Sequence, residues 1–232
     1  MKTWIWAVMV LASCATAPGE ADQTKKAPGA EAVGVAPVAA AAQPLTGVAA
    51  VYQESYDAEA GGKDDAALAA LDRLPASHKD AYLAHLRRGW LLAKLGKPAD
   101  AIAAYARATA AQPDAVEARI GALVPMGTLR RWTDIETTAR EVLARDPGNY
   151  TAQLRLAFAL YSLSRHQEAE ATYRKLSTLY PGDQEVRSGL GWSLVKLGKR
   201  DEAARVFADI VEVAPRHALA LEGLRATGGK PR

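Results

Sequence analysis

Cys14 is the residue whose type and setting most clearly predict covalent chemistry. It is the only cysteine of the 232-residue chain, so no intramolecular disulfide and no cysteine-based zinc site can form. It follows a cationic start and eight apolar residues, 4–11. A membrane-spanning helix needs about 20 apolar residues, so this run is too short to span a bilayer. The pattern instead predicts an export signal that ends at a thiol available for acylation.

Residues 11–14 read Leu-Ala-Ser-Cys and resemble the lipobox of bacterial lipoproteins. The resemblance implies a signal peptide over residues 1–13 and lipidation of Cys14, since two or more acyl chains anchor stably in a bilayer. Ala15 at the next position resembles the outer-membrane sorting pattern. The alternative is an ordinary cleaved signal cut after Ala17, although Pro18 would then lie unfavourably just beyond the cleaved bond.

Other chemistry-bearing residues form no convergent pattern. The four histidines, His78, His85, His166 and His217, lie in no HExxH-like spacing, and the P-loop, GxGxxG and GxSxG motifs are absent from the sequence. Acidic side chains fall on expected helix starts and solvated faces. We therefore expect no catalytic site, no cofactor and no metal. The net charge of +3, with both signs interspersed, also predicts no nucleic-acid binding.

The amino-acid composition indicates which kind of secondary structure must position any functional site. The chain contains 50 alanines and only 15 aromatic residues, which favours closely packed helices over a sandwich or barrel. After Cys14, residues 14–47 carry Pro18, Pro28, Pro37 and Pro44 among small residues. Prolines at this density stop helix propagation, so the segment is predicted to be a disordered linker.

The remainder repeats with a period of 34 residues. Prolines recur at 113, 147, 181 and 215, and leucines at 95, 129, 163 and 197. The register is kept over five units, 48–81, 82–115, 116–149, 150–183 and 184–217. A single hairpin cannot bury its apolar face alone, whereas stacked hairpins can.

These units resemble the tetratricopeptide repeat. The clearest copy is 184–217, with Gly191-Trp192 in its first helix, Leu197-Gly198 at its turn, Ala203 in its second helix and Pro215 after it. The resemblance implies an all-α fold: an α-solenoid of about five helix hairpins over 48–226, with a short cap at 218–226 and a tail at 227–232. It also implies a non-enzymatic protein that binds other proteins.

Each column of the repeat predicts a packing role. Gly89, Ala157 and Gly191 are small where two helices cross, and Tyr105, Tyr173, Phe207 and Leu71 are large enough to fill the space between hairpins. Gly96 and Gly198 suit a left-handed backbone at the turn. Asp64, Asp100, Asp134 and Asp201 lie near the expected starts of the second helices, where acidic side chains can bond free backbone amides and interact favourably with the helix dipole. The third unit departs most, since Pro125 lies within its first helix and predicts a kink.

In tetratricopeptide arrays the fifth, ninth and twelfth positions of each unit line the concave groove. The residues at these positions that we assign to partner binding are Tyr52, Tyr56, Leu86, Trp90, Ile120, Val124, Leu154, Phe158, Tyr161, Trp192 and Val195. They predict a continuous apolar lining with largely uncovered rings at Trp90, Phe158 and Trp192. Such a groove fits an amphipathic helix or an extended apolar segment. The alternative is that these side chains pack on neighbouring first helices.

Together these patterns predict an outer-membrane lipoprotein whose solenoid faces the periplasm and docks another envelope protein. The layout resembles lipoproteins that assist pilus secretins or motility machines. Two alternatives remain: a soluble periplasmic adaptor, and a subunit that recruits a cell-wall enzyme.

Overall fold

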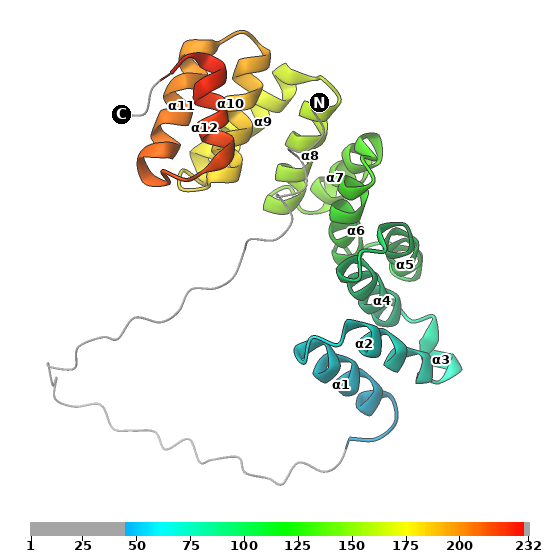
Figure 1. The fold of residues 1–232 in the computed structure, drawn as a ribbon. Helices are drawn as coiled ribbons and strands as arrows, with labels where there is room; N and C mark the ends of the chain where they lie inside the picture. The colour runs from blue at the N-terminus through cyan, green and yellow to red at the C-terminus, as the bar shows by residue number, and fades with distance from the viewer. Residues whose placement is uncertain (1–44, 230–232) are drawn as a thin grey trace, which may run out of the picture. The chain divides into compact units, whose positions relative to one another are not determined.

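The computed structural model describes residues 45–229, and within this range every regular element is a helix (Figure 1). The helices are α1 (Gly47–Ala60), α2 (Asp64–Ala70), the 3-10 turn η1 (Leu71–Arg73), α3 (Ala76–Lys79), α4 (Tyr82–Lys94), α5 (Pro98–Ala111), α6 (Glu117–Thr128), α7 (Trp132–Arg145), α8 (Tyr150–Ser162), α9 (His166–Leu179), α10 (Gln184–Lys196), α11 (Arg200–Val213) and α12 (Ala218–Thr227). The predicted signal peptide, Cys14, most of the predicted linker and the last three residues lie outside the described range.

Consecutive helices form hairpins that stack in chain order. The hairpins are α1–α2, α4–α5, α6–α7, α8–α9 and α10–α11, and the second helix of each also packs against the next hairpin. The first helices of the last four hairpins begin at Tyr82, Glu117, Tyr150 and Gln184. These starts lie at or next to the first residues of the 34-residue units, so the repeat period sets the structural period.

Aromatic side chains fill the spaces between hairpins, as the repeat columns predict. Tyr105, Tyr173 and Phe207 are each at most 3% exposed. The ring of Tyr105 lies between α4 and α6, where only glycine leaves room for it: a Cβ at Gly89 or Gly121 would lie 2.7 or 2.6 Å from ring atoms. The small-residue column therefore exists because each large ring needs a backbone surface to pack on.

The first hairpin has a separate small core. Leu71, Leu74 and Leu91 are buried together with Ala67 and Ala84, apart from the continuous core of the later hairpins. The second helix of this unit ends early, because α2 passes into the 3-10 turn η1 at Leu71. Less apolar area thus joins this hairpin to the next, which leaves more of the joint to polar contacts.

The turns inside the hairpins use a left-handed residue in every repeat. Gly62, Gly96 and Gly198 have φ of 71°, 69° and 75°, which confirms the predicted role of glycine at the last two. Arg130 and Ser164 occupy the same column with φ of 55° and 62°. The neighbouring hairpins therefore impose this backbone even where the side chain disfavours it.

The acidic residues near the starts of second helices lie in the first turn, as predicted, but they do not occupy the capping position. The N-cap positions are basic in all five hairpins, and none of these side chains accepts a capping hydrogen bond: Lys63, Lys97, Arg131, Arg165 and Lys199. Asp64, Asp100, Asp134 and Asp201 lie within the first turn instead. There their negative charges interact favourably with the positive end of the helix dipole. Asp134 also forms an ion pair with Arg131.

The irregular third hairpin and the last helix complete the array. Pro125 lies inside α6, which continues to Thr128, and its ring is buried. After Pro215, α12 agrees with the predicted cap to within one residue, and Gly223 of this helix packs on Phe207. None of the helices within residues 45–229 has the length and apolar character that crossing a membrane requires.

Candidate docking surface

Three ninth-position side chains of the first three repeats are exposed. Tyr56 on α1, Trp90 on α4 and Val124 on α6 are 45%, 52% and 38% exposed. Burying one aromatic side chain removes about 150–250 Å² of surface from water. Neighbouring rings left exposed to solvent are therefore typical of an interaction surface. We call Tyr56, Trp90 and Val124 the exposed stripe.

Trp90 is held in place by a carboxylate from the preceding repeat. Its indole Nε1 donates to Glu59 Oε1 on α1 at 2.6 Å. The ammonium of Lys94, one turn along α4, donates to the same oxygen at 3.0 Å and to Asp64 at 2.8 Å. The ring therefore presents its apolar faces to solvent while its polar hydrogen is satisfied.

Arg87 supports the other end of the stripe. Its guanidinium carbon lies 3.9 Å from the centre of the Tyr56 ring, and its nitrogens donate to the carboxylate of Glu59 and to the hydroxyl and carbonyl of Ser55. Ser55 in turn donates to the carbonyl of Ala67 at 2.8 Å. This buried network joins α1, α2 and α4, where the apolar core is thin.

The network controls the charge state of its acceptor. Partial burial pushes the pKa of Glu59 upward, but hydrogen bonds from Trp90, Lys94 and Arg87 outweigh it and lower the pKa to about 2. Hydrogen bonds to Asp64 and Glu59 raise the pKa of Lys94. Glu59 is thus ionised at neutral pH, which keeps all its donors engaged.

The expected lining is apolar only in part, and two of its rings are not uncovered. Glu59 occupies the twelfth position of the first repeat at the centre of the polar network. Phe158 packs edge-on against Trp132 at 5.4 Å, and Trp192 packs edge-on against Phe207 at 5.5 Å. Both are half-buried. The cause is packing between large rings. Trp132 on α7 covers Phe158 on the next hairpin, and Phe207 on α11 covers Trp192 within the same hairpin.

The remaining predicted groove residues are covered to different degrees. Leu154 is 4% exposed and belongs to the core, so it cannot contact a partner without rearrangement. The half-buried positions are Tyr52, Leu86, Ile120, Tyr161 and Val195. Their part in partner binding stays a prediction.

Sequence reasoning missed the polar residues that organise the stripe. Arg87 and Lys94 sit on α4 next to predicted groove positions and were not assigned to the site. Leu83, 46% exposed near the start of α4, was missed as well. Arg87 offered one signal, because a long basic side chain that is buried next to the groove residue Leu86 needs an acidic partner on a neighbouring helix.

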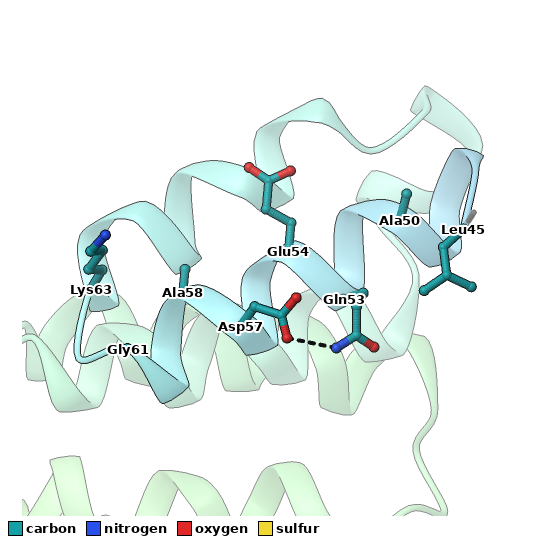
Figure 2. Close-up of a pocket in the computed structure, with 8 residues that line it drawn as sticks. All are labelled: Leu45, Ala50, Gln53, Glu54, Asp57, Ala58, Gly61 and Lys63. Carbon is teal, nitrogen blue, oxygen red and sulfur yellow. Dashed lines mark hydrogen bonds between the residues drawn. The ribbon is translucent and has the colours of Figure 1, made fainter. Parts of the chain in front are cut away.

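A shallow depression lies on the outer side of α1 (Figure 2). Its lining is Leu45, Ala50, Gln53, Glu54, Asp57, Ala58, Gly61 and Lys63. The amide of Gln53 donates to Asp57 at 2.8 Å, and Glu54 pairs with Arg73. These polar side chains satisfy one another, which suits the outer face of the first helix of a stacked array.

Catalytic geometry is not evident in the described range. Within residues 45–229, no three His, Cys, Asp or Glu side chains gather in a way that could hold a metal ion. The arrangement that does converge consists of exposed apolar faces on satisfied polar supports. Chemically, such a surface can bind an apolar segment of another molecule.

Models of the tetratricopeptide repeat match residues 52–116, 129–184 and 162–226. A crystal structure of a tetratricopeptide repeat protein from Parabacteroides merdae is 19% identical, with a TM-score of 0.68, covering 76% of this chain and 70% of that one. MamA from Desulfovibrio magneticus is 18% identical, with a TM-score of 0.67 and coverage of 72% and 94%. YrrB, described as a repeat protein with an unusual peptide-binding site, is 23% identical, with a TM-score of 0.57 and coverage of 65% and 78%. Among curated proteins, none matches this sequence.

Proposed function

Because the chain belongs to the tetratricopeptide repeat family, we propose that it is a non-catalytic scaffold that docks another envelope protein on the exposed stripe. Lipidation at Cys14 would hold it at the outer membrane with the repeats in the periplasm, where it would support assembly or stability of an envelope complex such as a pilus secretin or a motility machine. The exposure of Trp90, with its indole hydrogen already bonded, is the single observation that carries the docking proposal.

The spacing of the stripe favours a helical partner. Packed helices typically lie about 8–10 Å apart, and we take this as the interval between the ninth-position side chains of neighbouring first helices. Residues seven apart on one face of a partner helix are separated by about 10.5 Å, which matches. Residues two apart on an extended strand are separated by about 6.6 Å, which does not. An amphipathic helix with an apolar residue in every heptad therefore fits best.

The hydrogen bond that holds Trp90 in place should increase the affinity for a partner. Ordering a flexible side chain on binding costs about 0.5–1.5 kcal/mol. Trp90 is already fixed by Glu59, and the Tyr56 ring by Arg87, so less of this cost falls on association. Rigid aromatic residues with uncovered faces are the type that dominates binding energy at interfaces.

The docking proposal is tested by site-specific photo-crosslinking in the envelope. A photoreactive residue at Val124 should capture one defined partner, and the same residue at Leu179 should not. Leu179 is a matched control because it is 58% exposed but lies at the end of α9, outside the stripe. Trp90→Ala should abolish capture at Val124 in a folded protein. Equal capture from both positions would contradict the proposal.

The anchor is tested separately with Cys14→Ser. The lipoprotein proposal expects the variant to leave the membrane fraction, and intact mass of the wild-type protein to show a lipid-modified Cys14 at its N-terminus. An unmodified N-terminus after residue 17 would favour the soluble periplasmic adaptor. A cell-wall hydrolase captured at Val124 would favour the recruiting subunit.

A further inference from the structure

The turns that follow the exposed stripe carry cations. Tyr56, Trp90 and Val124 lie on the first helices of three successive repeats, and a basic residue follows each of them six or seven positions later, in the turn after the helix. These residues are Lys63, Lys97 and Arg130, which we call the turn cations. Their side chains are exposed and form no ion pair or hydrogen bond with residues 45–229. Unpaired positive charge therefore lines one edge of the exposed stripe.

The carboxylates near these turns do not neutralise the turn cations. Asp64 accepts from the lysine that ends α4, and Asp134 pairs with Arg131. Asp65 and Asp100 are exposed and form no ion pair within the part of the chain that the structure describes. The pair between Arg131 and Asp134 is thus not repeated one unit earlier, where a lysine and Asp100 occupy the same two positions.

Arg130 is the turn cation that costs the fold most. Its backbone is left-handed, with φ of 55°, a conformation that glycine adopts freely. Gly62 and Gly96 hold the same position in the first two repeats. The side chain of Arg130 forms no bond within residues 45–229 that could offset this strain. A strained residue without return inside the fold is typical of a side chain that acts on another molecule.

Helix dipoles do not explain the basic turns either. Each turn joins the negative end of a first helix to the positive end of a second helix, so one dipole attracts a cation there and the other repels it. Lys63 and Lys97 occupy the N-cap positions of α2 and α5 and cannot accept a hydrogen bond from the free amides. The fold therefore gains little from a lysine at either position.

We propose that the turn cations bind acidic side chains along one flank of the docked helix. The inference rests on the proposed function, which places a partner helix across the exposed stripe. Seven residues of helix rise about 10.5 Å, and a helix with its side chains is about 10–12 Å across. The flank of a helix centred on the stripe thus lies about 5 Å from the turns. A glutamate side chain on that flank can meet a lysine or arginine across this distance.

The partner is accordingly an amphipathic helix with aspartate or glutamate recurring once per heptad beside its apolar face. One acid in each heptad would meet one cation in each repeat, at the same interval at which the apolar residues meet the stripe. Exposed ion pairs are individually weak, and at the rim of an interface they act mainly on the association rate and on the choice of partner. The turn cations would therefore favour an acidic flank and disfavour a basic one.

The test compares the binding of two synthetic helices to the full chain. Both have three heptads and the same apolar face, and they differ at one flanking position per heptad, which is Glu in one peptide and Gln in the other. These residues have similar helix propensities. Fluorescence anisotropy of the labelled peptides gives the dissociation constants. The Glu peptide should bind roughly tenfold more tightly at low salt, and the advantage should disappear at about 0.5 M salt.

Arg130→Gly separates binding from folding. It should stabilise the fold, because the left-handed turn gains a glycine, yet weaken the Glu peptide about threefold and leave the Gln peptide unchanged. Ser164→Gly is the matched control, since Ser164 has φ of 62° at the same turn position of the fourth repeat, outside the exposed stripe. It should stabilise the fold without changing either affinity. Lys97→Glu should weaken the Glu peptide, whereas Lys199→Glu, the same change in the last repeat, should not.

Three results would overturn the proposal: no saturable binding of either peptide, equal affinities of the two, or equal losses in Arg130→Gly and Ser164→Gly. The two proposals also fail separately. If Trp90→Ala weakens both peptides while Glu and Gln bind equally, the acidic flank is wrong and the docking surface stands. If the preference for Glu persists but Trp90→Ala leaves both affinities unchanged, the docking surface is wrong as described.

Discussion

The indole nitrogen of Trp90 lies 2.6 Å from the carboxylate of Glu59, and this contact joins the first helices of two successive repeats. The same carboxylate accepts from Lys94 and Arg87. One side chain thus both joins the first two hairpins and orients the ring of Trp90, the aromatic side chain with the largest exposed fraction among residues 45–229. The fold and the proposed docking surface both depend on Glu59, so the pH dependence of stability reports on this residue.

Glu59 should make stability depend on acidic pH. Its pKa falls from 4.5 to about 2 on folding, so its contribution is fully present above pH 4.5 and is lost as pH falls through about 2. We expect Glu59→Gln to lower the free energy of unfolding by about 2–3 kcal/mol at pH 7. By pH 3 the difference from wild type should shrink by roughly half. Urea unfolding at both values checks this, and a pH-independent difference would contradict it.

His217 should weaken the last helix as pH falls from 7 to 5. Its Nδ1 accepts from the amide of Ala220 at 3.2 Å, as an N-cap does, and burial lowers its pKa. The neutral form is favoured in the fold, so stability is retained above the unfolded pKa near 6.5 and is lost below it. His217→Asn keeps a capping acceptor without this titration. Its urea midpoint should fall less than that of wild type over this range; parallel falls would contradict the assignment.

The contacts of Tyr105 predict intolerance at two glycines. In Gly89→Ala or Gly121→Ala the new Cβ would meet the Tyr105 ring at 2.7 or 2.6 Å. We expect each to lower stability by about 1–3 kcal/mol through overpacking, despite the better helix propensity of alanine. Gly182→Ala is the control, because nothing lies within 4 Å of its Cβ position. Equal unfolding midpoints in all three variants would show that the ring can move aside.

Two turns should gain stability from glycine. Arg130 and Ser164 hold left-handed backbones that side chains disfavour. Arg130→Gly and Ser164→Gly should therefore each raise the free energy of unfolding by roughly 1 kcal/mol. Arg216→Gly, at a residue without positive φ, should not. Thermal denaturation measures the change, and no gain at either turn would mean that the side chains contribute compensating contacts.

Trp90 and Trp192 should respond differently to truncation. Trp192 packs on the buried ring of Phe207, so Trp192→Ala should cost about 2–3 kcal/mol of folding free energy. Trp90 is half-exposed, so Trp90→Ala should cost about 1 kcal/mol, chiefly its bond to Glu59. Urea midpoints of the two variants make the comparison. Equal losses would place both rings in the core.

Much of the fold could be predicted because the same sequence pattern recurs in five units. The columns of Tyr105 and Phe207, with their small partners, place each hairpin, and the period places the helix starts. The helix caps could not be predicted in the same way. Aspartate near a helix start has the same local signature whether it caps or sits in the first turn, and the position of the basic N-cap residues depends on how the preceding turn closes.

The sequence by itself determined the helix-hairpin architecture, its register and the aromatic ninth column. Only the tertiary structure decided which of those rings are exposed and which polar atoms are satisfied. Exposure depends on whether a neighbouring helix offers a large ring, as Trp132 and Phe207 do for Phe158 and Trp192, or a carboxylate, as Glu59 does for Trp90. The physical reason is that local periodicity sets the direction of a side chain, whereas packing and hydrogen bonding across hairpins determine what covers it.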